Sequence, residues 1–187
     1  EVKSTFMSDI RKLMFQQEGS DVEFKCENDM DQPPIYAHKV ILCARSKFLR
    51  SMLTGGLLES QQKTVTMRDI SYDTLRAIVE FCYTDDVEEL NGEMIMEALV
   101  KARLFVLDGL LAILEAIVGY SLDVDNVISI LETAFVYELV GLAKSTKFFI
   151  LSHWAHVTSL PDWSTLNEKI RQRLTNTAIK WGVISQQ

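Results

Sequence analysis

Two neighbouring stretches decide the fold: Asp21-Val-Glu-Phe-Lys-Cys-Glu27 and Tyr36-Ala-His-Lys-Val-Ile-Leu-Cys-Ala-Arg-Ser-Lys-Phe48. In the first, polar and apolar residues alternate, so that Val22, Phe24 and Cys26 lie on one side of a half-buried strand. The second begins as a returning strand and then changes to helical spacing of its apolar residues. Strands and a helix in such close succession indicate a fold that mixes both kinds of element.

Before these stretches, residues 4–18 are predicted to form an amphipathic helix, which Gly19 would end as a C-terminal cap. Its apolar positions recur at i, i+4, i+7 and i+8, and they are Phe6, Ile10, Leu13 and Met14. A helix with one apolar stripe needs a surface against which to pack.

After them, residues 63–67 predict a third strand by alternation and β-branching. Everything beyond is predicted to be helical, with a break at Pro161. The expected helices cover about residues 72–83, 92–102, 107–120, 124–139, 144–153 and 164–180. This order predicts an α+β class rather than a regular βαβ alternation. Asp123 can cap a new helix after an apolar one, so we expect a boundary there, with domains at residues 1–121 and 122–187.

The composition is that of a globular protein. Of the 187 residues, 48% are hydrophobic and 24% are charged, which is enough apolar material for a core. The formal net charge of −7 argues against nucleic acid and anionic membranes as partners, because both attract Lys and Arg. The apolar run 104–118 is interrupted by Asp108 and Glu115 and is too short to span a bilayer.

The cysteines point to a reducing compartment. Cys26, Cys43 and Cys82 are odd in number, widely spaced and without a CxxC pair. No basic segment precedes an apolar run at the start, so no signal peptide is seen. We expect a cytoplasmic or nuclear protein, or one found in both. The chain opens on Glu1 without Met, which favours a fragment of a longer protein.

The search for catalytic or metal-binding groups gives little. His153 and His156 could share a helical face, but no third ligand lies at a suitable spacing. His38 and Cys43 lie off a common helical face, which favours a structural histidine and a buried thiol. The acidic pair Asp85-Asp86 reads as a solvated turn, and no phosphate-binding or nucleophile motif occurs. We therefore predict a non-enzymatic chain without cofactor or metal.

An ordered series of short motifs over about residues 5–120 resembles the BTB/POZ domain. Ser20-Asp-Val22 is followed by Ala37-His-Lys39 and by the loop Leu53-Thr-Gly-Gly-Leu-Leu-Glu-Ser60. Phe81-Cys-Tyr-Thr84 is similar to the family's Tyr-Thr-Gly element, with Asp85 in place of the glycine. This departure puts the turn after Tyr83 in doubt. The resemblance implies the BTB/POZ fold, a small mixed sheet flanked by helices.

The helices after residue 122 resemble the 3-box, the start of a BACK domain, that follows the BTB fold in cullin adaptors. Asp125-Asn-Val-Ile-Ser-Ile-Leu-Glu-Thr-Ala134 carries this resemblance, together with Leu142-Ala143 and Phe148-Phe-Ile150. A helical 3-box or partial BACK extension is therefore expected.

In the family, the first helix packs against its symmetry mate, and a charged pair lies close to that interface. The resemblance therefore implies a homodimer, with interface residues Phe6, Ile10, Leu13, Met14, Asp21 and Lys39. The alternative from the residues alone is that the first helix packs on its own core. A buried charged pair of this kind fixes specificity more than it adds stability.

Cullin-recruiting members present a hydrophobic-x-Glu element, which Leu57-Leu-Glu59 matches. An exposed Leu can anchor in a partner's groove while the carboxylate orients the contact. The alternative is a helix-end Leu packed into the core. The resemblance implies the cullin-binding residues Leu57, Glu59, Tyr83, Ile128 and Leu131.

The function implied is a substrate adaptor that homodimerises and recruits cullin-three into a ubiquitin ligase. An unknown ubiquitination substrate would bind through a module outside this chain. The alternative is a BTB scaffold for corepressor binding or for channel-type oligomerisation without cullin, against which the helical tail counts. A small hydrolase or redox enzyme would need a paired nucleophile and base.

Overall fold

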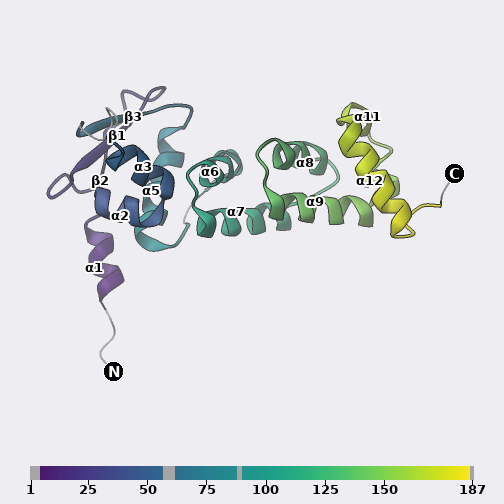
Figure 1. Ribbon diagram of the computed structural model, residues 1–187, viewed down its shortest axis with the longest axis horizontal. Helices are drawn as coiled ribbons and strands as arrows, with labels where there is room; N and C mark the ends of the chain where they lie inside the picture. Colours follow the sequence, from purple (N-terminus) through teal and green to yellow (C-terminus); the bar gives the residue numbers. More distant parts are fainter. Residues whose placement is uncertain (1–4, 57–61, 88–89, 186–187) are drawn as a thin grey trace. The chain divides into compact units, whose positions relative to one another are not determined.

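The computed structural model describes residues 5–56, 62–87 and 90–185 and divides the chain into two compact units, Glu1–Leu114 and Glu115–Gln187 (Figure 1). The division falls within α7. The first unit combines strands with helices, and the described part of the second is helical. In chain order the elements are α1 Phe6–Lys12, β1 Val22–Cys26, β2 Ile35–Ala37, α2 Lys39–Arg45, α3 Lys47–Thr54, β3 Thr64–Met67, α5 Tyr72–Thr84, α6 Gly92–Leu104, α7 Asp108–Tyr120, α8 Val127–Val136, α9 Val140–Ser152, α10 Trp154–Val157, α11 Pro161–Thr165 and α12 Glu168–Lys180.

The sheet of the first unit has the strand order β2-β1-β3. Strand β1 pairs with β2 antiparallel, so that Phe24 lies opposite Ile35, and with β3 parallel, so that Phe24 lies beside Val65. The buried residues of β1 alternate with half-buried ones, as period-two patterning requires. The predicted α+β class with a small mixed sheet is therefore confirmed.

A polar contact fixes the junction between α2 and α3. The Ser46 hydroxyl caps α3 by accepting the Leu49 N–H at 3.0 Å, and it donates to the Phe105 carbonyl at 2.6 Å. Ser46 is buried, so both bonds replace water that the hydroxyl has lost. One serine thus ties the start of α3 to the end of α6.

The first helix is shorter than the predicted 4–18. It ends at Lys12, and Phe15 then takes a left-handed conformation with φ of 62°. The Arg76 guanidinium lies over the Phe15 ring, 4.6 Å from its centroid, which holds this residue against α5. The periodicity is real over Phe6–Lys12, but a local turn ends the helix before Gly19.

The second unit is built on apolar packing. Helices α8 and α9 lie side by side in Figure 1, and α10 to α12 add to the same cluster. The helical run is interrupted before Pro161, as predicted, and Pro161 itself opens α11 at the start of the helix, where its missing N–H costs nothing. The predicted helix 164–180 begins later, as α12 at Glu168. The buried side chains of the cluster are Val127, Ile128, Leu131, Ile150, Val157, Leu166 and Leu174.

Across residues 5–56, 62–87 and 90–185, we find no helix that combines the length and the apolar character needed to cross a bilayer.

Candidate functional site

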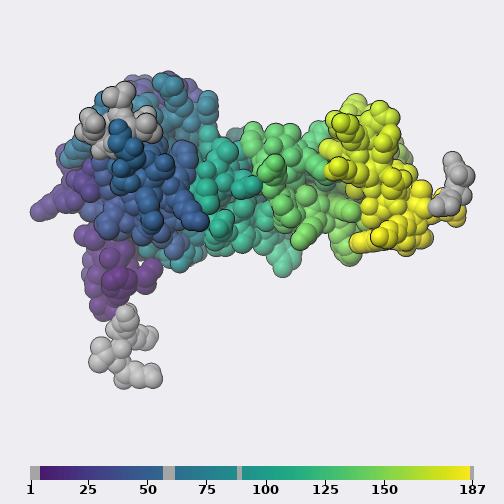
Figure 2. All heavy atoms as spheres, in the orientation of Figure 1, coloured from purple at the N-terminus to yellow at the C-terminus, as the bar shows by residue number. Residues whose placement is uncertain are grey.

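Helix α1 and the turn after it carry the four apolar residues predicted for self-association on a largely uncovered surface. None of its seven residues, all of them described, is buried. The side chains of Phe6 and Leu13 are 65% and 43% exposed, whereas Ile10 and Met14 are half-buried. In Figure 2 the atoms of α1 stand out from the rest of the first unit on the visible face. An apolar helix left this exposed on a chain otherwise able to build a core favours an interface.

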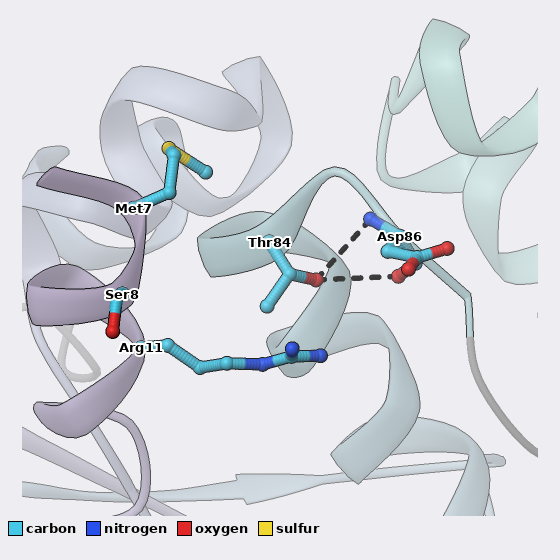
Figure 3. A pocket seen from close by; sticks show the side chains of 5 residues that line it. All are labelled: Met7, Ser8, Arg11, Thr84 and Asp86. Atoms are coloured by element: carbon cyan, nitrogen blue, oxygen red, sulfur yellow. Dashed lines mark hydrogen bonds between the residues drawn. The ribbon is translucent and has the colours of Figure 1, made fainter. Parts of the chain in front are cut away.

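A hollow of about 290 Å³ lies where α1 meets the end of α5 (Figure 3). Met7, Ser8 and Arg11 line it from α1, and Thr84 and Asp86 line it from the end of α5 and the turn that follows. The Arg11 guanidinium lies 3.7 Å from the Glu80 carboxylate. A salt bridge therefore holds α1 against α5 while its apolar side chains face outward.

Asp21 and Lys39, the predicted charged pair, are brought together. The Asp21 carboxylate accepts the main-chain N–H of Lys39 at 2.7 Å. Lys39 is the first residue of α2, so the carboxylate satisfies one of the helix's otherwise unbonded amides and meets the positive end of its dipole. This contact positions α2; that the pair lies at a dimer interface stays a prediction.

The predicted cullin contacts Leu57 and Glu59 lie outside the described residues. Tyr83 is described and buried at 3% exposure. Its hydroxyl accepts the His38 N–H at 2.9 Å and lies 2.8 Å from His38 Nδ1. Burial raises the pKa of Tyr83 to about 12. Tyr83 thus ties the end of α5 to the start of α2, and its burial lends no support to a direct partner contact.

Ile128 and Leu131 are likewise buried, at 5% and 1% exposure. Both belong to the apolar cluster of the second unit. These two side chains pack α8 into that cluster. A direct contact of these side chains with a partner stays a prediction.

Sequence reasoning missed an exposed apolar surface at the ends of α3 and α6. Phe48 stacks on Phe105, with ring centroids 4.8 Å apart and planes within 4°. Phe48 is 39% exposed, and Leu104 and Val106, which flank Phe105, are 50% and 37% exposed. We call Phe48, Leu104 and Val106 the α3–α6 patch. The tertiary contact between Phe48 and Phe105, beside the hydrogen bond of Ser46 to Phe105, brings the start of α3 to the end of α6.

Val106 is unusual within this patch. It takes a left-handed conformation with φ of 56°, which β-branched residues rarely adopt. The Leu107 N–H reaches back to the Ala102 carbonyl at 2.9 Å, the pattern of a helix C-cap where glycine is preferred. A strained, exposed valine at a glycine position favours a role for its side chain outside the fold.

Asp85, the departure from the family's glycine, takes a left-handed conformation that glycine adopts easily. It has a φ of 59° and its N–H bonds the Phe81 carbonyl, so it forms the left-handed cap of α5. Asp tolerates this conformation better than most residues. Its carboxylate pairs with Arg45, whose guanidinium lies 5.3 Å from the centroid of the Phe81 ring. The turn after Tyr83 is therefore a left-handed cap that an aspartate occupies.

The three cysteines all lie in surroundings that raise their pKa. Burial raises the pKa of Cys26 to about 11 and that of Cys82 to about 12, and it also raises the pKa of Cys43. These shifts disfavour the thiolate. Cys43 was predicted to be buried but is partly exposed. Within the part of the chain that the structure describes, no three His, Cys, Asp or Glu residues cluster as metal ligands.

Comparison with known proteins places this geometry in a family. A family model for the BTB/POZ domain matches residues 10–122, more than half of the chain. Kelch-like protein 8 of Caenorhabditis elegans is 24% identical over 195 residues, covering 97% of this chain and 28% of that protein. Kelch-like protein 26 of Homo sapiens is 27% identical over 130 residues, covering 70% and 21%. The chain therefore spans less than a third of these relatives.

Among solved structures, the BTB domain of zebrafish PATZ1 is 20% identical with a TM-score of 0.49, covering 63% of this chain and 95% of that one. The BTB domain of human gigaxonin is 20% identical with a TM-score of 0.48, covering 61% and 92%. The identification of the helices after residue 122 as a 3-box, and the boundary at 121/122, stay predictions. The ordered motifs, the mixed sheet and the family model agree over the same residues, and the chain belongs to the BTB/POZ domain family.

Proposed function

We propose that this chain is a non-catalytic adaptor, cytoplasmic or nuclear, that homodimerises and recruits cullin-three into a ubiquitin ligase. Helix α1 would form the dimer contact. The α3–α6 patch would form the cullin contact together with Leu57 and Glu59. A substrate would be brought by a module outside this chain. Kelch-like proteins among the relatives support this choice within the family.

The α3–α6 patch is the observation that carries the proposal. Protein interfaces are anchored by a few large apolar or aromatic side chains that lose their water on binding. Phe48 offers such an anchor on a rigid support, because Phe105 beneath it is buried and Ser46 fixes the backbone. The same helix α3 leads towards Leu57 along the chain. In this proposal the partner also contacts the hydrophobic-x-Glu element.

The helices after residue 122 would extend this contact surface. A specific interface usually buries more than roughly 1,000 Å² in total, which the α3–α6 patch alone does not supply. In this proposal Ile128 and Leu131 keep α8 and α9 in shape, and neighbouring exposed side chains make the contact.

Calorimetric titration with the amino-terminal domain of cullin-three tests the proposal. We expect wild type to bind and Phe48→Asp to bind at least about tenfold more weakly, because a charge would be buried at an apolar anchor. Met30→Asp is the matched control, since Met30 is 52% exposed in the turn between β1 and β2, outside the patch. Leu57→Asp should weaken binding as Phe48→Asp does.

Absence of cullin binding by wild type would overturn the proposal and favour the alternative, a scaffold for corepressor binding or oligomerisation. Equal affinity of wild type and Phe48→Asp would remove the patch from the interface. Light scattering tests the dimer separately. Wild type should have twice the monomer mass at tens of micromolar, and Phe6→Asp should shift it towards the monomer.

A further inference from the structure

A second apolar surface lies wholly within the second unit and is lined by residues of α8, α9 and α12 and by Asn167. Two adjoining hollows of about 490 and 200 Å³ share Phe135, Ile170 and Arg173 in their linings. Leu131 and Leu174, both buried, line the smaller one. We call this surface the α8–α12 groove. Its size suits one or two large side chains of a partner.

The groove is apolar at its centre and open to a partner. Phe135 is 40% exposed and Val136, beside it on α8, is 73% exposed, while Ile170 is half-buried. Exposed apolar side chains on a groove floor gain by being covered, since they then leave water. Grooves of this kind between helices commonly receive an amphipathic segment.

Charge decides which segment would fit. Lys147, Lys169 and Arg173 line the groove, and Glu132 is its one acidic lining residue. Among the residues that the structure describes, the side chains of these three cations form no hydrogen bond or ion pair. They are therefore available to a ligand.

This cationic rim contrasts with the chain as a whole. Residues 1–114 contain 19 Asp and Glu against 13 Lys and Arg, whereas residues 115–187 contain seven against six. The groove is thus a local positive site on an acidic protein. Complementary charge across an interface steers encounter and selects partners. Carboxylates beside an apolar anchor complement both the cations and the apolar side chains of this groove.

We infer that the α8–α12 groove binds a short segment of a partner protein in which Leu, Phe or another large apolar side chain is flanked by Asp or Glu. The apolar side chain enters over Phe135 and Ile170. The carboxylates pair with Lys147, Lys169 and Arg173. This site is separate from the α3–α6 patch and does not rest on cullin recruitment.

Selection from a phage-displayed library of random peptides of about 12 residues tests the inference, with the complete chain as bait. The expected binders combine at least one large apolar residue with two or more acidic residues. Enriched peptides are then synthesised, and their affinity is measured by fluorescence anisotropy. Raising the salt concentration should weaken their binding, since exposed ion pairs are screened.

Variants then locate the site. Arg173→Glu and Lys147→Glu should each weaken the peptides at least about tenfold, and Arg173→Lys should retain most of the affinity. Lys180→Glu is the control, because Lys180 lies on the same helix α12 outside the groove lining. Phe135→Ser should also weaken binding, and circular dichroism shows whether each variant is folded.

Three outcomes overturn the inference: no enriched peptide, enriched peptides without acidic residues, or affinity that Arg173→Glu and Lys147→Glu leave unchanged. Self-association is a further outcome. If Phe135→Ser lowers the mass of the wild-type assembly in light scattering while Phe6→Asp does not, a second copy occupies the groove. In that case the inference of an acidic partner segment is wrong.

Discussion

The two compact units use their polar side chains differently. In the first, hydrogen bonds of side chains join distant parts of the chain: Ser46 with Phe105, 59 residues apart, and His38 with Tyr83, 45 residues apart. In the second, most described side-chain hydrogen bonds stay within seven residues. The exception is Glu115, which accepts the Leu142 N–H 27 residues away.

This difference indicates what specifies each unit. Buried polar groups whose hydrogen bonds are all formed favour one arrangement of the helices and strands. Any other arrangement would leave these groups without hydrogen-bond partners. A bundle whose hydrogen bonds are local depends instead on the fit of its apolar side chains. Apolar truncation should therefore harm the second unit most, and loss of a single polar group should harm the first.

The largest effect is expected from Leu131→Ala in the second unit. Leu131 is 1% exposed at the centre of the apolar cluster, so truncation leaves a cavity and should cost about 2–5 kcal/mol of unfolding free energy. Chemical denaturation followed by tryptophan fluorescence measures this, because every tryptophan lies in the second unit. They are Trp154, Trp163 and Trp181.

Val136→Ala is the matched control for this experiment, since Val136 is on the same helix and 73% exposed. It should change the free energy of unfolding by less than about 0.5 kcal/mol. Equal effects of Leu131→Ala and Val136→Ala would contradict the view that packing specifies the second unit.

The next largest effect is expected from Glu97→Gln in the first unit. The Glu97 carboxylate accepts the Ser71 N–H at 2.8 Å and the hydroxyls of Ser71 and Thr74, which ties α6 to the start of α5. Losing a charged acceptor should cost about 1–3 kcal/mol. Hydrogen exchange of the α5 amides measures it, with the exposed Glu93→Gln as control.

The same carboxylate gives the first unit a pH dependence. Burial raises the pKa of Glu97, but the hydrogen bonds from Ser71 and Thr74 outweigh burial and hold the pKa of this carboxyl below its usual value. A carboxyl whose pKa is lowered by folding stabilises the folded state at pH values above its pKa in the unfolded chain. This stability is lost as the pH falls through its pKa in the folded chain. Acid unfolding of wild type should show this loss below about pH 4.5, and Glu97→Gln should lack it.

A smaller effect is expected from Tyr83→Phe. The substitution keeps the ring but leaves the His38 N–H without its acceptor, which should cost about 1–2 kcal/mol. Chemical denaturation, with hydrogen exchange of the α2 amides as the readout, measures this loss of unfolding free energy. Tyr120→Phe is the control, because Tyr120 is 93% exposed. If Tyr83→Phe instead abolished cullin binding with stability unchanged, its predicted contact role would be favoured over a structural one.

The sequence predicted the strands best, because alternation is a local signal. Strand β1 lies within the predicted stretch 21–27, and β2 lies where a returning strand was expected. The first helix ends and the last one begins at turns that periodicity does not reveal. Phe15 adopts its left-handed turn under the Arg76 side chain, a contact between segments far apart in sequence.

The candidate site was predicted less well, since motifs carry residue type but not exposure. Tyr83 and Leu131 match family positions but are buried. Phe48 belongs to the stretch that decides the fold, and nothing in that pattern indicates that its side chain is exposed. The position of the Phe48 side chain depends on its stacking over Phe105. The spacing of residues in the sequence does not predict this contact. The motifs therefore predicted which segments form the candidate site, but not which of their side chains are exposed.

The smallest effect is expected at Asp85, where two opposing contributions nearly cancel. Asp85→Gly removes the strain of a non-glycine residue at a φ of 59°. It also removes the ion pair with Arg45, which contributes little because the Asp85 side chain is largely exposed. The unfolding free energy should change by less than about 1 kcal/mol. Asp85→Val should destabilise clearly more, because β-branching is strained at positive φ. Thermal denaturation compares them with Asp86→Gly as control; equal effects of Gly and Val would show that the turn does not depend on this conformation.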